Sequence, residues 1–239
     1  MQFNLDKILI ILILILSILI YYFANLSNNN RNIKSVEINI TPTNLNFISS
    51  DSVLKTVDKY TVATKGNIYL SKIEEDINKN SLVQNTEAYI SPDQKLYLDI
   101  KQKEPIARIF TNDSSFYLDK NSNLMNLSNL QSVKVPLIFG FNNKSNINYL
   151  SKISLLINND DFLSANISQI IILENQQINL RLRRSNVLIE LGNNFNLNKK
   201  IQNLKAFYTR AYELNEVDKY KKLNLRFENQ VIAVKKTNL

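Results

Sequence analysis

Residues Ile8–Phe23 read ILIILILILSILIYYF, a run that is apolar throughout except for Ser17 and the tyrosine hydroxyls. Extended through Leu26, this stretch rises about 28 Å as a helix, close to the thickness of a bilayer core. Each Ile or Leu favours membrane insertion by roughly 0.3–0.6 kcal/mol. No second run like it follows. The sequence therefore predicts one transmembrane helix over residues 8–26, between a tail of residues 1–7 and a long remainder.

A cleaved signal peptide is the alternative interpretation of this run. Such a peptide needs a basic n-region, a shorter apolar core and small residues before the cleavage site. The basic groups before the core are Lys7 and the terminal amine, and a cut after Ala24 would leave Tyr22 where a small residue is needed. The paired tyrosines are typical of a membrane interface. We favour an uncleaved anchor with a cytoplasmic tail and an exported remainder, and basic residues just beyond the run leave the orientation open.

The remainder is large enough for two small domains with cores of their own. It contains no cysteine, so exported domains must be held together by packing alone. The net charge is +8, but the basic residues are scattered and many lie near acidic ones. Heavy use of Asn, Ile, Lys and Leu fits AT-rich coding DNA. We therefore interpret the charge as a bias of composition rather than as attraction to anionic lipid or wall polymer, and we expect no nucleic-acid partner.

The composition also excludes several kinds of catalytic site. Without His or Cys there is no Ser-His-Asp triad, no thiolate nucleophile and no usual zinc site. The three glycines, Gly66, Gly140 and Gly192, form no phosphate loop or dinucleotide fingerprint. The carboxylates of Glu74–Asp76 fall on a predicted helix, where adjacent residues do not share a face, and Asp160–Asp161 is typical of a helix or turn start. We expect no catalytic residue, no metal and no cofactor.

Residues 33–105 are predicted to form a small domain after a polar spacer at residues 27–32. Its elements are a strand over 33–40, helices over 49–60 and from 71, and strands over 83–90 and 95–103. Ser71 and Glu74 have the spacing of a capping box at the second helix. The predicted apolar faces carry Val53, Leu54, Val57, Ile73, Ile77, Leu96, Leu98 and Ile100. We expect both helices to cover one face of a three-stranded sheet.

Residues 106–239 are predicted to form a larger, β-rich domain with helices. Strands are predicted over 106–110, 116–118, 124–125, 137–139, 167–173, 178–182, 187–191, 222–227 and 230–234. Helices are predicted over 148–157 and 198–214, the second with apolar residues at helical spacing. The fold class is therefore α+β: one transmembrane helix, a small β-α-α-β-β domain, and a larger β-rich domain.

Several strings resemble, in order and spacing, the motifs of one family. They are Val36-Glu37-Ile38, Gly66-Asn67-Ile68-Tyr69 with Ile73-Glu74, LDIKQKEPIA at 98–107, Tyr117-Leu118-Asp119 through Met125, VPLIFG at 135–140, IELG at 189–192 with Lys200 and Leu204, and LNLRF at 223–227. Lys103 stands where Arg is usual, Ser122 where Gly is usual, and Asn224 and Phe227 where Asp and Tyr are usual. Over nearly its whole length the chain resembles the bacterial cell-division family FtsQ (DivIB in Gram-positive bacteria), most closely versions from Bacteroidetes-like bacteria.

The resemblance implies a non-enzymatic scaffold of the divisome in the inner membrane. Its small domain would be a POTRA module that makes the recruitment contact, and both domains would lie in the periplasm at the division septum. It implies FtsB-like and FtsL-like partners and a role in recruiting and regulating septal peptidoglycan synthesis. FtsK-like and FtsW-like proteins are further candidate contacts.

The resemblance also implies a partner-binding site at the last strands, where an FtsB-type segment pairs with an exposed sheet edge. The matching residues here are Arg226 and Phe227, with Asn224 and Asn229 flanking them. A regular strand would place Arg226 and Phe227 on opposite faces, so only one of them would touch a given partner surface. A core position is the alternative for Phe227.

Three other functions stay open. The chain is compatible with a POTRA-containing, membrane-anchored binding module in envelope assembly or secretion, although such proteins usually carry several of these domains or a barrel. A membrane-anchored enzyme of wall metabolism is disfavoured by the missing His, Cys and glycine loops. An unrelated surface-anchored binding protein is the third.

Overall fold

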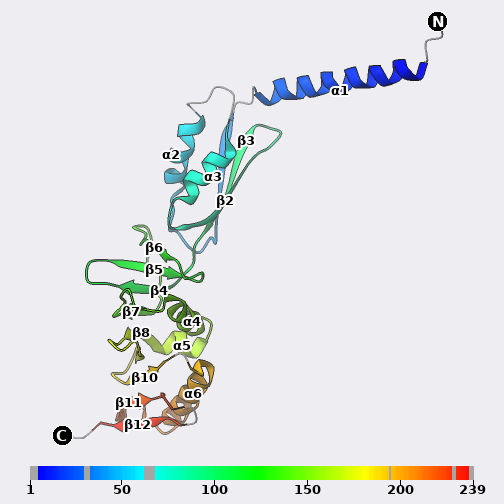
Figure 1. Cartoon of the computed structure of the whole chain (residues 1–239). Coiled ribbons are helices and arrows are strands. Elements are labelled where there is room, and N and C mark those ends of the chain that lie inside the picture. Colours follow the sequence, from blue (N-terminus) through cyan, green and yellow to red (C-terminus); the bar gives the residue numbers. More distant parts are fainter. Residues whose placement is uncertain (1–4, 30–32, 62–67, 194, 228–229, 237–239) are drawn as a thin grey trace. The chain divides into compact units, whose positions relative to one another are not determined.

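The computed structural model describes residues 5–29, 33–61, 68–193, 195–227 and 230–236. The protein has mixed α and β structure, with one N-terminal apolar helix and two separate sheets. It divides into two compact units, Met1–Gln102 and Lys103–Leu239 (Figure 1).

Helix α1 (Leu5–Asn29) contains the predicted span and extends beyond it at both ends. Its window Lys7–Ala24 has a mean hydropathy of 2.7 and is long and apolar enough to cross a membrane. None of that window is buried within the protein, and the Ser17 hydroxyl donates to the Leu14 carbonyl at 2.8 Å. A helix that is apolar on all sides and that no described residue buries fits a single-pass membrane protein. A signal sequence has the same properties, so the choice of an uncleaved anchor stays a prediction. The helix includes the first part of the predicted spacer, and residues 30–32 lie outside the described residues.

The first unit has the predicted element order of strand, helix, helix, strand, strand. The elements are β1 (Ser35–Thr41), α2 (Ser50–Thr61), α3 (Leu70–Asn78), β2 (Val83–Ile90) and β3 (Lys95–Gln102). The sheet order is β1-β3-β2, with β3 parallel to β1 and antiparallel to β2. Figure 1 shows α2 and α3 on the same side of this sheet. The predicted layout of three strands under two helices is confirmed.

The core of this sheet forms where the sequence alternates. Leu96, Leu98 and Ile100 on β3 are at most 1% exposed, as predicted from their shared face. Val57 of α2 and Ile73 of α3 are fully buried as well. Burial of each such side chain contributes roughly 1.5–3 kcal/mol, which holds the helices on the sheet.

The predicted capping box at the start of α3 is wrong. The helix begins at Leu70, Tyr69 occupies the N-cap position without a side-chain hydrogen bond, and Ser71 is exposed inside the first turn. The Glu74 Oε1 atom accepts a hydrogen bond from the Ala88 N–H at 2.7 Å instead. A contact to β2 therefore replaces the local cap.

Gln102 closes β3 with a fully buried amide. Its Oε1 atom accepts from the N–H groups of Phe47 and Ile48 at 2.9 and 3.2 Å, and its Nε2 atom donates to the Leu45 carbonyl at 3.0 Å. Buried backbone groups need such partners. This amide therefore fixes the segment that leads into α2.

The second unit is built on a nine-stranded sheet. Its strands are β4 (Pro105–Phe110), β5 (Ser115–Asp119), β6 (Leu124–Met125), β7 (Leu137–Phe139), β8 (Ile167–Ile172), β9 (Ile178–Leu182), β10 (Leu188–Gly192), β11 (Tyr220–Asn224) and β12 (Ile232–Lys235). Its helices are α4 (Ile147–Asn158), α5 (Asp161–Asn166), α6 (Leu197–Glu213) and the 3₁₀ turn η1 (Val217–Lys219). The sheet order is β12-β11-β10-β9-β8-β7-β4-β5-β6. All nine strands lie where the sequence predicted them, with shifted ends, and α5 is an additional short helix.

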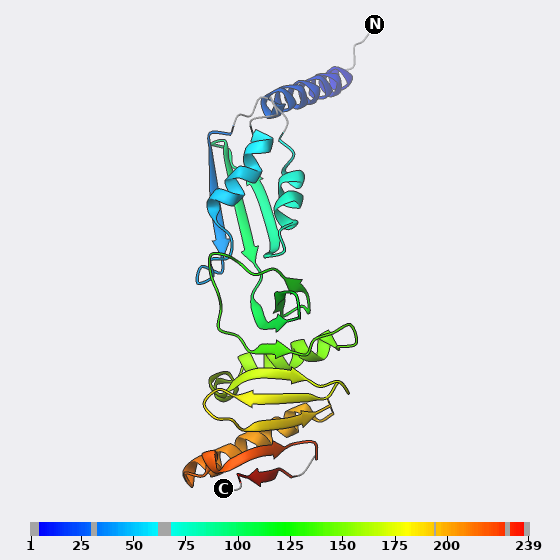
Figure 2. The same ribbon diagram turned by 90° about the vertical axis from the view of Figure 1, so that its left-hand side faces the viewer.

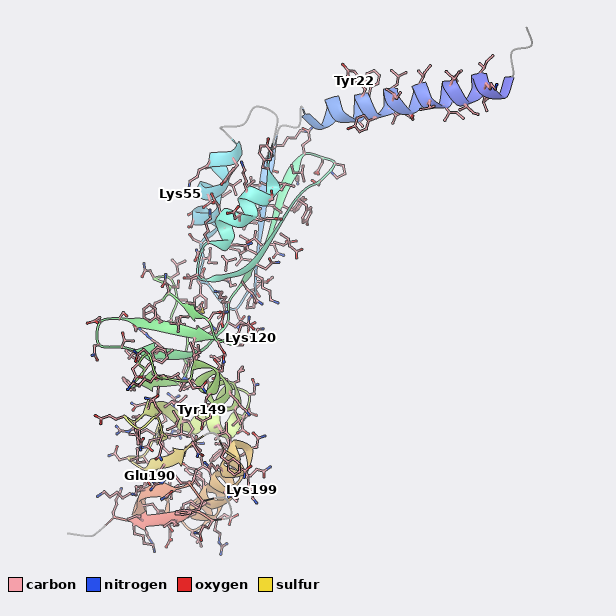
Figure 3. All side chains as sticks on the ribbon, in the orientation of Figure 1. Tyr22, Lys55, Lys120, Tyr149, Glu190 and Lys199 are labelled. Carbon is pink, nitrogen blue, oxygen red and sulfur yellow. The ribbon has the colours of Figure 1, made fainter. Side chains whose placement is uncertain are left out.

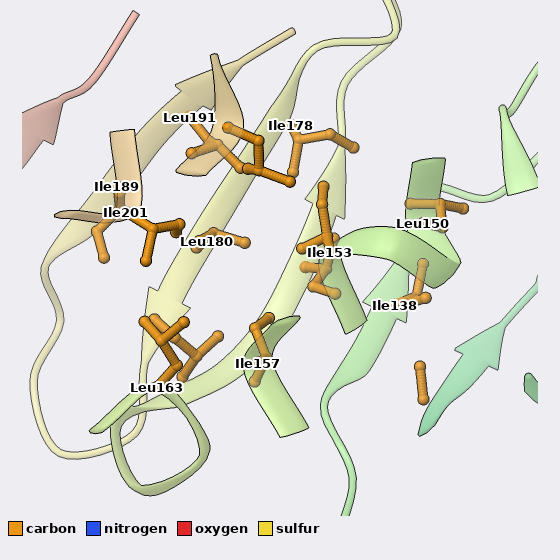
Figure 4. Packing of buried hydrophobic residues seen from close by; sticks show 14 of the residues in the cluster. Ile138, Leu150, Ile153, Ile157, Leu163, Ile178, Leu180, Ile189, Leu191 and Ile201 are labelled. Atoms are coloured by element: carbon orange, nitrogen blue, oxygen red, sulfur yellow. The ribbon is translucent and has the colours of Figure 1, made fainter. Parts of the chain in front are cut away.

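The strand register aligns one buried row across six strands. This row consists of Ile109, Ile138, Ile170, Leu180, Ile189 and Leu223. Leu150, Ile153 and Ile157 of α4, Leu163 of α5 and Ile201 of α6 pack against it (Figure 4). Figure 1 shows α4, α5 and α6 on one side of the sheet, and Figure 2 views the strands from the other side with α6 (orange) behind them. The opposite face of the sheet therefore carries no helix in the part of the chain that the structure describes.

Candidate partner-binding edge

Strand β12 forms one edge of the nine-stranded sheet. It pairs with β11 on one side, and no described strand pairs with its other side. Two of its apolar side chains, Ile232 and Val234, are 41% and 42% exposed. An open edge offers backbone N–H and C=O groups to an incoming strand. This edge is therefore a template on which an extended segment can pair.

The strand before this edge is shorter than predicted. β11 ends at Asn224 rather than continuing through Phe227, although the Leu225 N–H still donates to the Glu190 carbonyl at 2.9 Å. The Asn224 Oδ1 atom accepts from the Arg226 N–H at 3.0 Å, a local turn that competes with strand pairing. The predicted strand alternation of Arg226 and Phe227 is therefore wrong.

Arg226 belongs to a hydrogen-bonded cluster with Glu190, Lys222 and Asn224, which we call the Glu190 cluster. The Arg226 Nη2 atom lies 3.0 Å from Glu190 Oε2, and its Nε atom donates to Asn224 Oδ1 at 3.2 Å. Lys222 Nζ donates to Glu190 Oε1 at 3.1 Å. Glu190 projects on the side of the sheet away from α6 (Figure 3). One carboxylate thus faces two cations. The sheet face opposite the helices, which we call the open face, is therefore positively charged at this place.

The Arg226 side chain packs against Gly192 so closely that a larger residue at position 192 would collide with it. A Cβ atom at residue 192 would lie 2.8 Å from Arg226 Cγ, and the Gly192 φ angle is +78°. Only glycine combines this close approach with this backbone conformation at low cost. The glycine of the quoted IELG string therefore lies directly under the candidate arginine.

A buried lysine, Lys200, holds the end of β10 next to Gly192. Lys200 of α6 is 2% exposed, and its Nζ atom donates to the carbonyls of Leu191 and Asn193 at 3.0 and 3.1 Å and to Asn193 Oδ1 at 3.3 Å. A buried ammonium group needs such acceptors. Lys200 therefore fixes the loop that follows β10, and so explains the lysine of the quoted motif.

The other predicted site residues have different surroundings. Phe227 is 48% exposed, so the alternative of a core position is wrong. Asn229 lies outside the described residues. The structure brings Asn224 and Arg226 into direct contact and leaves the Phe227 ring accessible next to them.

Glu190 and Lys222 are site residues that the sequence analysis did not assign. Glu190 lies within the quoted IELG string, but its role depends on β10 pairing in parallel with β11, which aligns it with Asn224. Alternation within a strand carries no information on this pairing.

The far end of β12 is tied to η1. The Glu216 carboxylate accepts from Lys219 Nζ at 3.1 Å and from the Tyr220 hydroxyl at 3.3 Å, and the Lys236 N–H donates to the Lys219 carbonyl at 2.7 Å. The Lys219 hydrogen bond holds the pKa of Glu216 below its ordinary value. The Lys236 bond ties the end of β12 to η1, and the two Glu216 bonds hold η1 beside the start of β11.

Within the described ranges, no group of three or more His, Cys, Asp or Glu side chains has an arrangement that could hold a metal ion. The candidate site therefore consists of an open sheet edge, the Glu190 cluster with its excess of positive charge, and exposed apolar side chains.

One apolar helix followed by two units of mixed structure fits the class of single-pass membrane proteins. A model of the family FtsQ/DivIB, C-terminal related, matches residues 104–234, which is more than half of the chain. The chain therefore belongs to the FtsQ/DivIB family, whose members are non-catalytic scaffolds of cell division. The matched residues lie within the second unit and include the candidate edge strand β12 except for its last residue, Lys235. No curated protein sequence matches the chain.

Proposed function

We propose that this protein is a non-enzymatic divisome scaffold that binds an FtsB-like protein through the edge of β12 and, with it, an FtsL-like protein. The open edge strand supports this mode of binding, and membership of the FtsQ/DivIB family supports a role in cell division. Through these partners the protein recruits and regulates septal peptidoglycan synthesis.

In this proposal an extended partner segment adds a tenth strand to the sheet. Main-chain hydrogen bonds supply affinity and alternate side chains supply specificity. On the open face, the register places Val234 beside Lys222 and Ile232 beside Asn224. A partner strand would therefore present apolar side chains to the two exposed residues of β12. A carboxylate of the partner would fit beside Arg226, because the single Glu190 carboxylate already binds both Lys222 and Arg226 and leaves one positive charge without a counter-charge in this cluster.

The proposal also covers the rest of the chain. α1 anchors the protein in the inner membrane with a cytoplasmic tail and with both units in the periplasm. The first unit acts as a POTRA module that makes the recruitment contact at the septum, where FtsK-like and FtsW-like proteins are candidate neighbours. Its element order and its three-stranded sheet under two helices are compatible with this role.

Co-purification of the FtsB-like protein with the full-length chain tests the edge contact. The test variant is Ile232→Asp with Val234→Asp, since both side chains are exposed and the change leaves the core intact. The control is Leu130→Asp, a side chain that is 53% exposed and lies outside β12. We expect the double variant to lose the partner and the control to retain it. Equal retention by both would refute the edge contact.

A fluorescent fusion of the full-length chain tests the cellular role. We expect it to mark the division site. An even distribution around the envelope would contradict the septal role and favour the alternative of a POTRA-containing binding module in envelope assembly.

A further inference from the structure

A basic hollow opens at one end of the second unit's sheet, where β9 and β12 end and β10 and β11 begin. Its volume is about 480 Å³. Its walls include Arg181 at the end of β9, Arg183 and Arg184 in the loop that follows, and Lys236 just after β12. Three of these cations come from the single string RLRR at residues 181–184. We call this the basic hollow.

The cations of the basic hollow lack acidic partners. Arg181, Arg183, Arg184 and Lys236 are all exposed, and none of them forms a salt bridge with any residue that the structure describes. The one carboxylate in the lining is Asp218, so four cations less one anion leave a charge of +3. Like charges gathered in one concave place repel each other and raise the local concentration of anions. The lining is therefore complementary to an acidic ligand.

A second hollow adjoins the first and shares Arg184, Ser185 and Asp218 with it. Its volume is about 300 Å³, and Tyr208, Tyr212, Asn215 and Val217 complete its wall. Tyr212 is 72% exposed. Tyrosine rings offer an apolar face beside a polar hydroxyl, as in many peptide-binding surfaces. We call this the tyrosine hollow.

We propose that the two hollows together bind an acidic segment of a partner protein. Its carboxylates lie against the arginines, and a neighbouring aromatic or aliphatic side chain lies against the tyrosines. Arginine favours this chemistry because its planar guanidinium binds a carboxylate through two parallel hydrogen bonds.

Two features favour a peptide over an anionic membrane surface. The cations line a hollow rather than a flat patch. Membrane-surface binding also uses exposed apolar side chains, and the lining has no exposed Leu, Ile or Phe. This inference goes beyond the proposed edge contact and does not require it, because it involves no pairing with β12.

Fluorescence anisotropy on the full-length chain in phosphatidylcholine nanodiscs tests the inference. The probe is a fluorescein-labelled peptide of sequence GEEYEEYG, and its uncharged counterpart is GQQYQQYG. The test variant is Arg181→Glu with Arg184→Glu. The control is Lys144→Glu with Lys152→Glu, which makes the same change of charge at exposed residues outside both hollows.

We expect the acidic peptide to bind the native chain and the test variant to bind it about tenfold more weakly or worse, as for the loss of charge-assisted contacts. The control should stay within about twofold of the native chain, and added salt should weaken binding. No binding of the acidic peptide, equal binding of GQQYQQYG, or an equal loss in the control would overturn the inference. Phosphatidylglycerol vesicles form a separate arm. Capture that depends on Arg181 and Arg184, without peptide binding, would assign the hollow to lipid headgroups and likewise overturn it.

Discussion

At the scale of single residues, Ser122 occupies a position that suits glycine. It lies in the turn between β5 and β6 with a φ angle of +66°. The buried Asp119 carboxylate sets this turn, because its Oδ1 atom accepts from the N–H groups of Asn121 and Asn123 at 2.9 and 2.8 Å. The turn therefore forces the residue between them into the left-handed region, whatever its side chain.

Replacing Ser122 by Gly should therefore stabilise the second unit. We expect a gain of about 0.5–1 kcal/mol in the free energy of unfolding, because an L residue is strained in the left-handed region. Urea denaturation of residues 103–239, followed by circular dichroism, measures it. The matched control is Ser164→Gly inside α5, which should lose about 0.5 kcal/mol because glycine weakens a helix. A loss at Ser122 as well would mean that this strain is absent.

Substitution of Gly192 should destabilise the second unit for a different reason, because Gly192 lies in contact with Arg226. Gly192→Ala is expected to lower the free energy of unfolding by about 1–3 kcal/mol, from the unfavourable φ angle and the collision with Arg226 Cγ. In an Arg226→Ala background only the φ strain is left, so the loss should shrink by about 1 kcal/mol. Gly140→Ala is the contrast, since its Cβ would collide with the Ile172 carbonyl oxygen, which no side-chain change removes. Additive effects of the changes at 192 and 226 would contradict the contact.

At the scale of elements, Asp160 links α5 to α6. Its Oδ1 atom accepts from the Leu163 N–H at 3.0 Å as the N-cap of α5, and its other oxygen accepts from Lys205 Nζ on α6. The Lys205 hydrogen bond, followed by that of Leu163, holds the pKa of Asp160 below its ordinary value. A carboxyl with a lowered pKa in the folded state stabilises the fold above its unfolded pKa. That contribution is lost as the pH falls through the folded pKa.

Asp160→Asn keeps an oxygen for the cap but removes the charge. We expect a lower melting temperature than the native protein at pH 7 and a difference that shrinks as the pH falls from about 5 to about 2, the range in which a lowered aspartate pKa acts. Thermal melts of residues 103–239 across this range measure it. Asp113→Asn, an exposed loop carboxyl outside the salt bridges of the described residues, is the control and should change little at either pH. A difference that persists at low pH would show that the amide acts through the cap instead.

The elements also show where prediction from sequence succeeds and where it stops. Leu96, Leu98 and Ile100 alternate so regularly that their strand and its buried face were predictable. The end of β11 was not, because the Asn224 side chain captures the next backbone N–H in place of the ladder. α5 has six residues, too few to show a helical period, although Asp160–Asp161 marked its start.

Some residues of the candidate site were likewise predictable from the sequence, and others were not. The quoted LNLRF string pointed to Asn224 and Arg226, which do lie in contact. Glu190, thirty-six residues before Arg226 in the chain, enters the site only through the parallel pairing of β10 with β11. The basic hollow likewise gathers Lys236 and the RLRR string from two distant segments. Such gathering follows from sheet order, which a single sequence does not display.

At the scale of the whole molecule, the second unit has a core of its own. The cluster of buried apolar residues runs from Ile106 to Leu225 and draws every member from within Lys103–Leu239. The family match over residues 104–234 covers the same part of the chain. A unit of this size with a continuous core has the properties of an independently folding domain.

We therefore expect the fragment Lys103–Leu239 to fold without the rest of the chain. It should unfold cooperatively in urea and resist limited proteolysis, since its buried core needs no residue from outside. The control fragment begins at Phe116 and lacks β4, which lies between β5 and β7 in the sheet. Without that strand, Ile106, Ala107 and Ile109 are missing from the core and β7 loses a neighbour, so this shorter fragment should aggregate or digest rapidly. If the longer fragment unfolded gradually and digested as fast as the shorter one, the second unit would depend on the first for its stability.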